Sequence, residues 1–179
     1  MSNVNNPHGL RPLMRTDAGG APECEDYTKD SGYAQAIYIW DPVTLLAGLL
    51  NGPASGITPG MTRYLGVVMG PGSAASLQNN FMLVMTSRDA LYETQEDSSG
   101  ASNVVAAKMG YNENLTTTAG DATRFTSKVQ LSGTSINTTS SLDVNIRRLL
   151  NVIDNAYGAY ARLEIKFNKH LQNPEVTQT

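Results

Sequence analysis

Apolar and polar residues alternate in short segments along the chain, and the last of these segments shows the pattern most clearly. In Ala161–Asn168 every second residue is apolar, and the residues between them are polar or charged. Such alternation is typical of an antiparallel strand with one face on the core and one in solvent. The charged residues Glu164 and Lys166 should therefore be exposed. The side chains expected in the core are Leu163, Ile165 and Phe167.

Five further segments are rich in β-branched and aromatic residues, and turn residues bound them, so we also expect them to be strands. They are Tyr33–Trp40, Arg63–Met69, Phe81–Met85, Ala90–Gln95 and Arg124–Leu131. Asp41 and Pro42 end the first segment, and Gly70, Pro71 and Gly72 end the second.

Three other segments have less decisive patterns. Val43–Leu50 is apolar and fits either a strand or a short helix. Leu142–Ile153 fits both helical spacing and alternation, and its β-branched content and Ser/Thr-rich approach favour a strand. Asn103–Met109 fits one or two helical turns, with Ser102 or Asn103 as the N-cap and Gly110 just past the end.

These elements together predict an all-β fold. We expect an antiparallel β-barrel or sandwich of about seven or eight short strands, with an extended N-terminal arm and at most one short helix. The expected organisation is an arm over residues 1–30, a β-barrel domain over 31–171 and a polar C-terminal tail over 172–179.

The N-terminal arm shows no periodicity and is interrupted by proline and glycine. Residues of this kind exclude a helix or a central strand. Its apolar side chains would gain little in solvent, so we expect the arm to lie on its own barrel or on a neighbouring subunit, with the barrel folding independently of it. The contact residues expected in the arm are Leu10, Arg11, Leu13, Met14 and Arg15.

Composition and charge narrow the classes of function. Only 16% of the 179 residues are charged, against the usual ~25%, and the net charge is −3. An acidic chain without a basic patch makes nucleic acid an unexpected partner. No apolar run reaches the ~20 residues of a membrane span, and the N-terminus lacks a secretory signal, so we expect no membrane partner.

Candidate catalytic residues are few. Cys24 is the only cysteine, which excludes an internal disulfide framework and a Cys-rich zinc site. A Cys–His nucleophile is formally possible with His8 or His170, but Glu23 and Glu25 flank the thiol and should raise its pKa. We therefore expect a structural cysteine and no enzymatic activity.

One cluster of acidic residues is a candidate cation site. It consists of Asp89, Glu93, Glu96 and Asp97. Calcium prefers oxygen ligands, but this spacing does not match a calcium loop with alternating ligands and a central glycine. A solvated strand end is the better interpretation, so no metal and no cofactor is expected.

Several blocks of the sequence resemble small head proteins of tailed bacteriophages, a family described as capsid decoration, cement or stabilising proteins. The blocks that carry the resemblance are Asn6–Leu13, Arg88–Asp97, Val104–Asn112, Arg147–Asn155 and Ala161–His170. The chain departs from the family pattern where Ala90 and Ile153 replace proline and where Lys169 replaces glutamate.

The resemblance implies a structural protein without catalytic residues. It implies a β-barrel on the outer surface of a phage capsid, made in the host cytoplasm, that binds the major capsid protein and holds neighbouring capsomers together. A homotrimer is the expected state, because cyclic symmetry closes an oligomer and local threefold positions are common docking points.

One alternative function stays open, namely a small β-barrel surface module that binds a carbohydrate or another host-surface ligand. Such a module should present aromatic side chains around a concave site. The candidates are Trp40, Tyr64, Tyr92 and Tyr111. Trp40 ends an apolar segment and is expected in the core, which disfavours this alternative.

Overall fold

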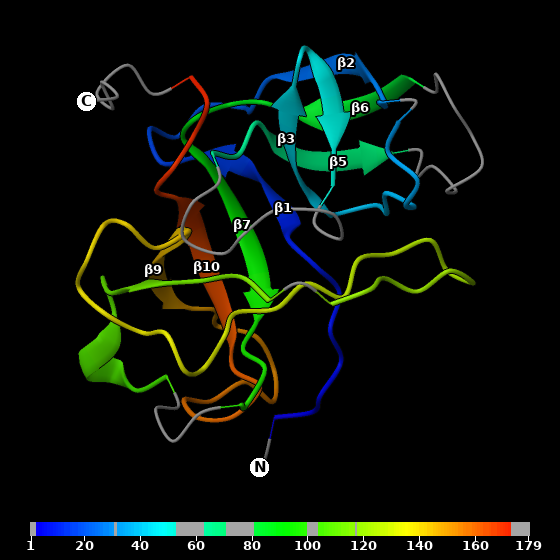
Figure 1. Ribbon diagram of the computed structural model, residues 1–179. Helices are drawn as coiled ribbons and strands as arrows, with labels where there is room; N and C mark the ends of the chain where they lie inside the picture. Colours follow the sequence, from blue (N-terminus) through cyan, green and yellow to red (C-terminus); the bar gives the residue numbers. More distant parts are fainter. Residues whose placement is uncertain are drawn as a thin grey trace.

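Two antiparallel sheets of five strands each make up the fold (Figure 1). The computed structural model describes residues 3–30, 32–52, 63–70, 81–99, 104–116 and 118–172. Sheet A contains, in spatial order, β1 (Arg11–Thr16), β7 (Ala90–Gln95), β10 (Arg162–Phe167), β9 (Val144–Leu149) and β8 (Asn112–Glu113). Sheet B contains β2 (Cys24–Thr28), β6 (Phe81–Met85), β5 (Gly66–Gly70), β3 (Pro42–Leu46) and β4 (Leu49–Asn51).

The predicted all-β class and antiparallel pairing are confirmed, whereas the number of strands and the barrel are corrected. The described residues form ten strands rather than seven or eight. Both sheets are open, with β1 and β8 at the edges of sheet A and β2 and β4 at the edges of sheet B. A barrel requires the first and last strands of a sheet to pair, which does not occur in either sheet.

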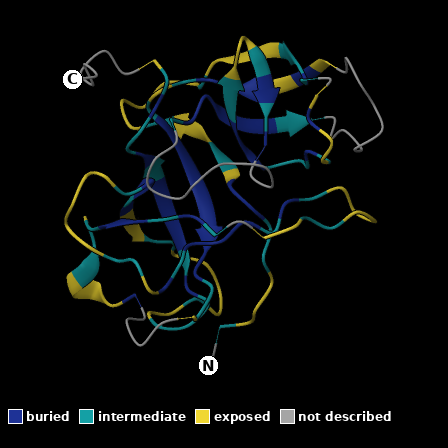
Figure 2. Cartoon of the chain, viewed as in Figure 1, coloured by how far each residue is buried: buried dark blue, intermediate teal, exposed yellow. Residues whose placement is uncertain are grey.

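A first hydrophobic core lies against the inner face of sheet A. The interior strands β7 and β10 are almost entirely buried and are dark blue in Figure 2. Phe167 stacks on Tyr64 with ring centroids 4.6 Å apart and lies 5.2 Å from the ring of Tyr92. Val67 and Met85 reach this core from sheet B, so both sheets contribute to it.

A second core lies on the opposite face of sheet B. Val68 of β5 and Met82 and Val84 of β6 point into it, because neighbouring residues of a strand face opposite sides of the sheet. Tyr33 and Ile37 cover it from the segment that precedes β3. Sheet B is therefore apolar on both faces, and sheet A on its inner face.

Most strand predictions are confirmed. β6 and β7 have the predicted bounds, and β9 lies inside Leu142–Ile153, the segment for which a strand was favoured. The ambiguous segment Val43–Leu50 is a hairpin of β3 and β4. Its loop residues Ala47 and Gly48 have φ values of 51° and 83°, as the tight two-residue hairpin turn requires.

Two strand predictions are wrong. Tyr33–Trp40 and Arg124–Leu131 form only isolated bridges, one of which joins Ile39 to Thr126. The Asp121 side chain accepts hydrogen bonds from the backbone of Thr123 and Arg124, which turns the chain where an extended strand was predicted. Single buried residues such as Ile37, Val129 and Leu131 fill the cores, which does not require a strand ladder.

The segment 1–30, predicted as a separate arm, contributes an edge strand to each sheet. β1 pairs with β7, and β2 pairs with β6. Leu10 is completely buried in the first core, and its N–H donates to the Trp40 carbonyl at 3.0 Å. The segment therefore lies on its own chain, and the expectation that the rest of the chain folds without it stays a prediction. Proline is tolerated in β1 because this strand lies at a sheet edge.

The predicted short helix is confirmed, but it is shorter than the predicted segment Asn103–Met109. A turn of 3₁₀ helix, Ala106–Lys108 (η2), lies inside the predicted segment, and Gly110 follows it with a φ of 85°. The predicted caps Ser102 and Asn103 lie outside the described residues. The same holds for Pro71 and Gly72 of the predicted turn and for residues 173–179 of the predicted tail.

Candidate functional site

The outer face of sheet A carries a row of charged side chains that crosses four strands. Strand register places Arg11 of β1 beside Glu93 of β7, Glu93 beside Glu164 of β10, and Glu164 beside Arg148 of β9. Residues directly opposite each other in a sheet are close enough for their side chains to interact. The row therefore has acidic residues in the middle and arginines at both ends.

Glu93 is held by two arginines. Its side chain is 1% exposed and forms ion pairs with Arg11 and Arg162, and the Arg162 Nε donates to Glu93 Oε1 at 2.6 Å. His8 Nε2 lies 3.5 Å from the same oxygen. Burial lowers the pKa of His8, so the imidazole is neutral near pH 7 and Arg11 and Arg162 supply the positive charge.

Glu164 is held in the same way by Arg15 of β1 and Arg148 of β9. The Arg148 Nε and Nη2 donate to Glu164 Oε2 at 3.1 and 3.0 Å, and Arg15 pairs with the same oxygen. The prediction that Glu164 is exposed is wrong, because strands flank β10 on both sides and their arginines cover the carboxylate. Lys166, also predicted to be exposed, is half-buried.

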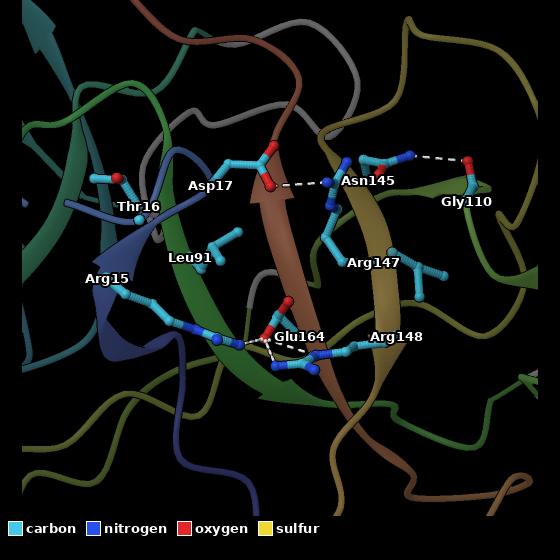
Figure 3. Close-up of a pocket in the computed structure, with 11 residues that line it drawn as sticks. Arg15, Thr16, Asp17, Leu91, Gly110, Asn145, Arg147, Arg148 and Glu164 are labelled. Carbon is cyan, nitrogen blue, oxygen red and sulfur yellow. Dashed lines mark hydrogen bonds and ion pairs between the residues drawn. The ribbon is translucent and has the colours of Figure 1, made fainter.

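A pocket of about 400 Å³ opens beside this ion-paired carboxylate. Figure 3 shows Arg15 and Arg148 converging on Glu164 from opposite sides, with Arg147 directed toward Asp17. The distance from Arg147 Nη2 to Asp17 Oδ1 is 2.8 Å. Three arginines therefore line this pocket, and their side chains remain 41 to 57% exposed.

A second pocket, of about 460 Å³, adjoins the first and shares Asn145 and Arg147 with it. Lys166 Nζ lies 2.5 Å from Asp89 Oδ1 and 3.5 Å from Asp17 Oδ2. The hydrogen bond from Lys166 lowers the pKa of Asp89, so this carboxylate stays charged at neutral pH.

We call the surface formed by these two pockets the basic groove. Five basic and three acidic side chains line it, although the whole chain has a net charge of −3. The basic residues are Arg15, Arg88, Arg147, Arg148 and Lys166. The groove is therefore a local positive surface on an acidic protein, suited to contact with carboxylate-rich surfaces.

The five contact residues predicted in the arm have different positions. Leu10 is completely buried in the protein's own first core. Arg11 and Arg15 belong to the outer face of sheet A, where they pair with Glu93 and Glu164. Leu13 is half-buried, and Met14 is 60% exposed.

The basic groove was not predicted from the sequence. Arg147 and Arg148 are consecutive residues of β9, so strict alternation would place them on opposite faces of the sheet. A register irregularity next to Glu164 lets both of these consecutive residues line the pocket, against strict alternation. The alternation in β10 was the one sequence signal for this charged surface, because it places Arg162, Glu164 and Lys166 on the same face of the strand.

The four acidic residues rejected as a cation site form no common site, and the interpretation as a solvated strand end is wrong for Glu93 and Glu96, which are buried. Asp89 pairs with Lys166 and Glu93 with arginines, whereas Glu96 accepts the Tyr160 N–H and Asp97 accepts the Gly133 N–H. Among the described residues, no three His, Cys, Asp or Glu side chains are grouped so that they could hold a metal ion.

Cys24 lies on the exposed edge strand β2. Partial burial raises the pKa of its thiol, as predicted, although the prediction had assigned the effect to the neighbouring carboxylates. Within the described part of the chain, no hydrogen bond joins Cys24 to His8 or His170.

Comparison with protein-family models, with curated proteins and with solved structures found no match. The described segments also contain no helix whose length and hydrophobicity would allow it to span a membrane.

Proposed function

We propose that this protein is a structural virion component that binds the outer surface of a phage capsid and stabilises contacts between capsomers. One observation carries the proposal. The five blocks that resemble decoration proteins are distant in the sequence, yet each lies in or next to a strand of sheet A, and none lies in sheet B. Matches arising by chance would be expected on both sheets.

The blocks follow the strands of sheet A closely. Asn6–Leu13 leads into β1, Arg88–Asp97 contains β7 and Val104–Asn112 leads into β8. Arg147–Asn155 begins in β9, and Ala161–His170 contains β10. The resemblance therefore maps to one continuous structural unit, which supports its origin in a shared fold and function.

The outer face of sheet A is the surface that we propose for capsid contact. Its basic groove offers exposed guanidinium groups already held in place by Glu164 and Asp17, so little side-chain freedom is lost on binding. Specific protein contacts bury about 1,200–2,000 Å² in total, an area that extends beyond the groove to the flanking strands. Binding the assembled shell more tightly than free capsomers would stabilise the shell by linkage.

Reconstitution tests the proposal. Purified protein is added to heads assembled from the major capsid protein of the same phage, and bound copies are counted after sedimentation. We expect saturation at a fixed number of copies per head and greater resistance of the heads to heating. Heads that bind no protein at saturating concentrations would contradict the proposed function.

The proposed contact face is tested by charge reversal. The double variant Arg147→Glu, Arg148→Glu should weaken head binding about tenfold or more, because two groove cations become anions. The matched control Arg124→Glu, Lys128→Glu also reverses two positive charges, neither of which lines these pockets, and it should bind as the wild type does. Equal losses in both proteins would assign the effect to net charge and exclude the groove as the contact face. The predicted homotrimer is tested separately by sedimentation equilibrium.

A further inference from the structure

A pocket of about 560 Å³ lies on the outer face of sheet A beyond the basic groove. The N-terminal segment that precedes β1, the residue Trp40 and the loop at Ile153 and Asp154 enclose it. None of its lining residues belongs to the basic groove. Its size falls in the range of small-molecule sites, about 300–1,000 Å³.

Trp40 supplies an aromatic wall to this pocket. It was predicted to be a core residue, but it is only half-buried and packs against the edge of the first core. Its backbone is held in place, because its N–H donates to Val68 O at 2.8 Å and its carbonyl accepts from Leu10 N. The His8 ring and the Trp40 indole form a T-shaped contact with their centroids 6.4 Å apart, which further restrains the indole.

The backbone of two residues that line the pocket is in the left-handed region. Trp40 has a φ of 69° and Asp154 a φ of 59°. Left-handed conformations cost free energy in residues other than glycine, and such residues cluster at binding sites, where the surrounding structure imposes them. The described structure has five further non-glycine residues with a positive φ, and Trp40 and Asp154 are the two that line this pocket.

Planar polar side chains surround the opening of the pocket. In the described structure, the side chains of Asn5, Asn6 and Asp154 form no hydrogen bond or ion pair with other residues, so their donors and acceptors are available to a ligand. On the inner side, Arg11 and Arg162 retain free guanidinium N–H groups after pairing with Glu93.

The charges in and behind the pocket balance. Arg11 and Arg162 are offset by Glu93 and Asp154, and His8 is neutral at pH 7 because burial lowers its pKa. A neutral ligand is therefore favoured over an anion or a cation. The Trp40 face suits an apolar C–H surface, whereas amides, a carboxylate and guanidinium groups suit several hydroxyl groups at once.

We infer that this pocket binds a neutral saccharide, with a sugar ring against Trp40 and its hydroxyl groups on Asn6, Asp154 and Arg162. The inference goes beyond the proposed capsid role and is independent of it, because binding requires only the free protein in solution. A pyranose ring has one apolar face and a hydroxyl-rich edge, which matches the two kinds of surface that the pocket presents.

The fluorescence of Trp40 tests this directly, since it is the only tryptophan in the chain. The probes are maltose, lactose, N-acetylglucosamine and methyl β-D-glucopyranoside, with the anionic N-acetylneuraminic acid as comparator. We expect at least one neutral sugar to change the emission saturably, with a Kd of about 10 mM or below. No saturable change with any neutral sugar, or saturation with the anionic sugar alone, would overturn the inference.

Two variants locate the binding site. Asp154→Asn keeps a residue that tolerates the left-handed conformation, and Asn6→Ala removes one amide. Each should weaken sugar binding about tenfold with Tm unchanged, whereas the control Asp26→Asn, at an exposed carboxylate of β2 that lines none of these pockets, should bind as the wild type does. Unchanged affinity in both pocket variants would place any sugar binding elsewhere and refute the assignment. Head binding is measured in parallel, so that failure of either function is recognised separately.

Discussion

Glu93 and Glu164 lie directly opposite each other on neighbouring strands, and their side chains are only 1% and 6% exposed. Like charges at such positions repel and destabilise a sheet. Four arginines offset the repulsion here, namely Arg11, Arg15, Arg148 and Arg162. Because these come from β1, β9 and β10, the two carboxylates connect four strands of sheet A through its outer face.

The first prediction concerns this arrangement. Glu93→Gln should lower the free energy of unfolding by about 1–3 kcal/mol, because Arg11 and Arg162 lose the charge that they share. Urea denaturation measures the change. Glu23→Gln, at an exposed position, is the matched control and should stay within about 0.5 kcal/mol of the wild type. If both variants were equally stable, the ion pairs of Glu93 would make no net contribution to the free energy of unfolding.

The second prediction concerns the stacked aromatic rings of the first core. Phe167→Ala should cost about 3–5 kcal/mol, since the ring is 5% exposed and contacts Tyr64 and Tyr92. Phe81→Ala makes the same chemical change at a residue that is 70% exposed, and its cost should be below about 1 kcal/mol. Thermal denaturation of the two variants side by side measures the difference, and a larger cost at Phe81 would contradict the described register of β10.

The third prediction concerns the N-terminal segment. Leu10→Ala should destabilise the protein by about 2–5 kcal/mol, because the side chain is fully buried in the first core. Met14→Ala alters an apolar residue of the same segment that is 60% exposed and should have little effect on stability. If Leu10→Ala unfolded at the same urea concentration as the wild type, this segment would be an independent arm after all.

The fourth prediction concerns pH. Burial, together with the nearby charges of Glu96 and Asp97, raises the pKa of Glu113 to about 9. Between its unfolded value near 4.5 and about 9, the folded protein binds more protons than the unfolded chain, so stability falls as pH rises through this window. Burial raises the pKa of Asp41 to about 7. This group also makes stability fall as pH rises, but only below about pH 7. The range from pH 7 to 9 therefore reports mainly on Glu113.

The measurement is Tm as a function of pH. Wild-type Tm should decrease from pH 7 to 9, and Glu113→Gln should flatten that decrease and raise Tm at pH 9 by about 2–4 °C for each kcal/mol gained. The exposed control Glu23→Gln should retain the wild-type slope. An unchanged slope in Glu113→Gln would mean that this buried carboxyl is already ionised in the folded protein at neutral pH.

The residues that enter the core from the central strands are predictable from the pattern of the sequence alone. Leu163, Ile165 and Phe167 are buried as the alternation of β10 predicted, and the bounds of β6 and β7 are those read from the pattern. Side-chain alternation is a local property of an extended backbone, so it is visible without knowledge of the neighbouring strands. The all-β class follows from the same local signal repeated along the chain.

The arrangement of side chains on the outer face of sheet A depends on contacts between strands that are distant in the sequence. Glu164 looked like a solvent-facing residue, and its burial depends on Arg15 and Arg148, which are distant in sequence and adjacent only through strand order. Trp40 was likewise assigned to the core, and its place beside a pocket depends on the segment that precedes β1. Strand order and loop packing are set by contacts between distant residues, which periodicity within a single segment does not encode.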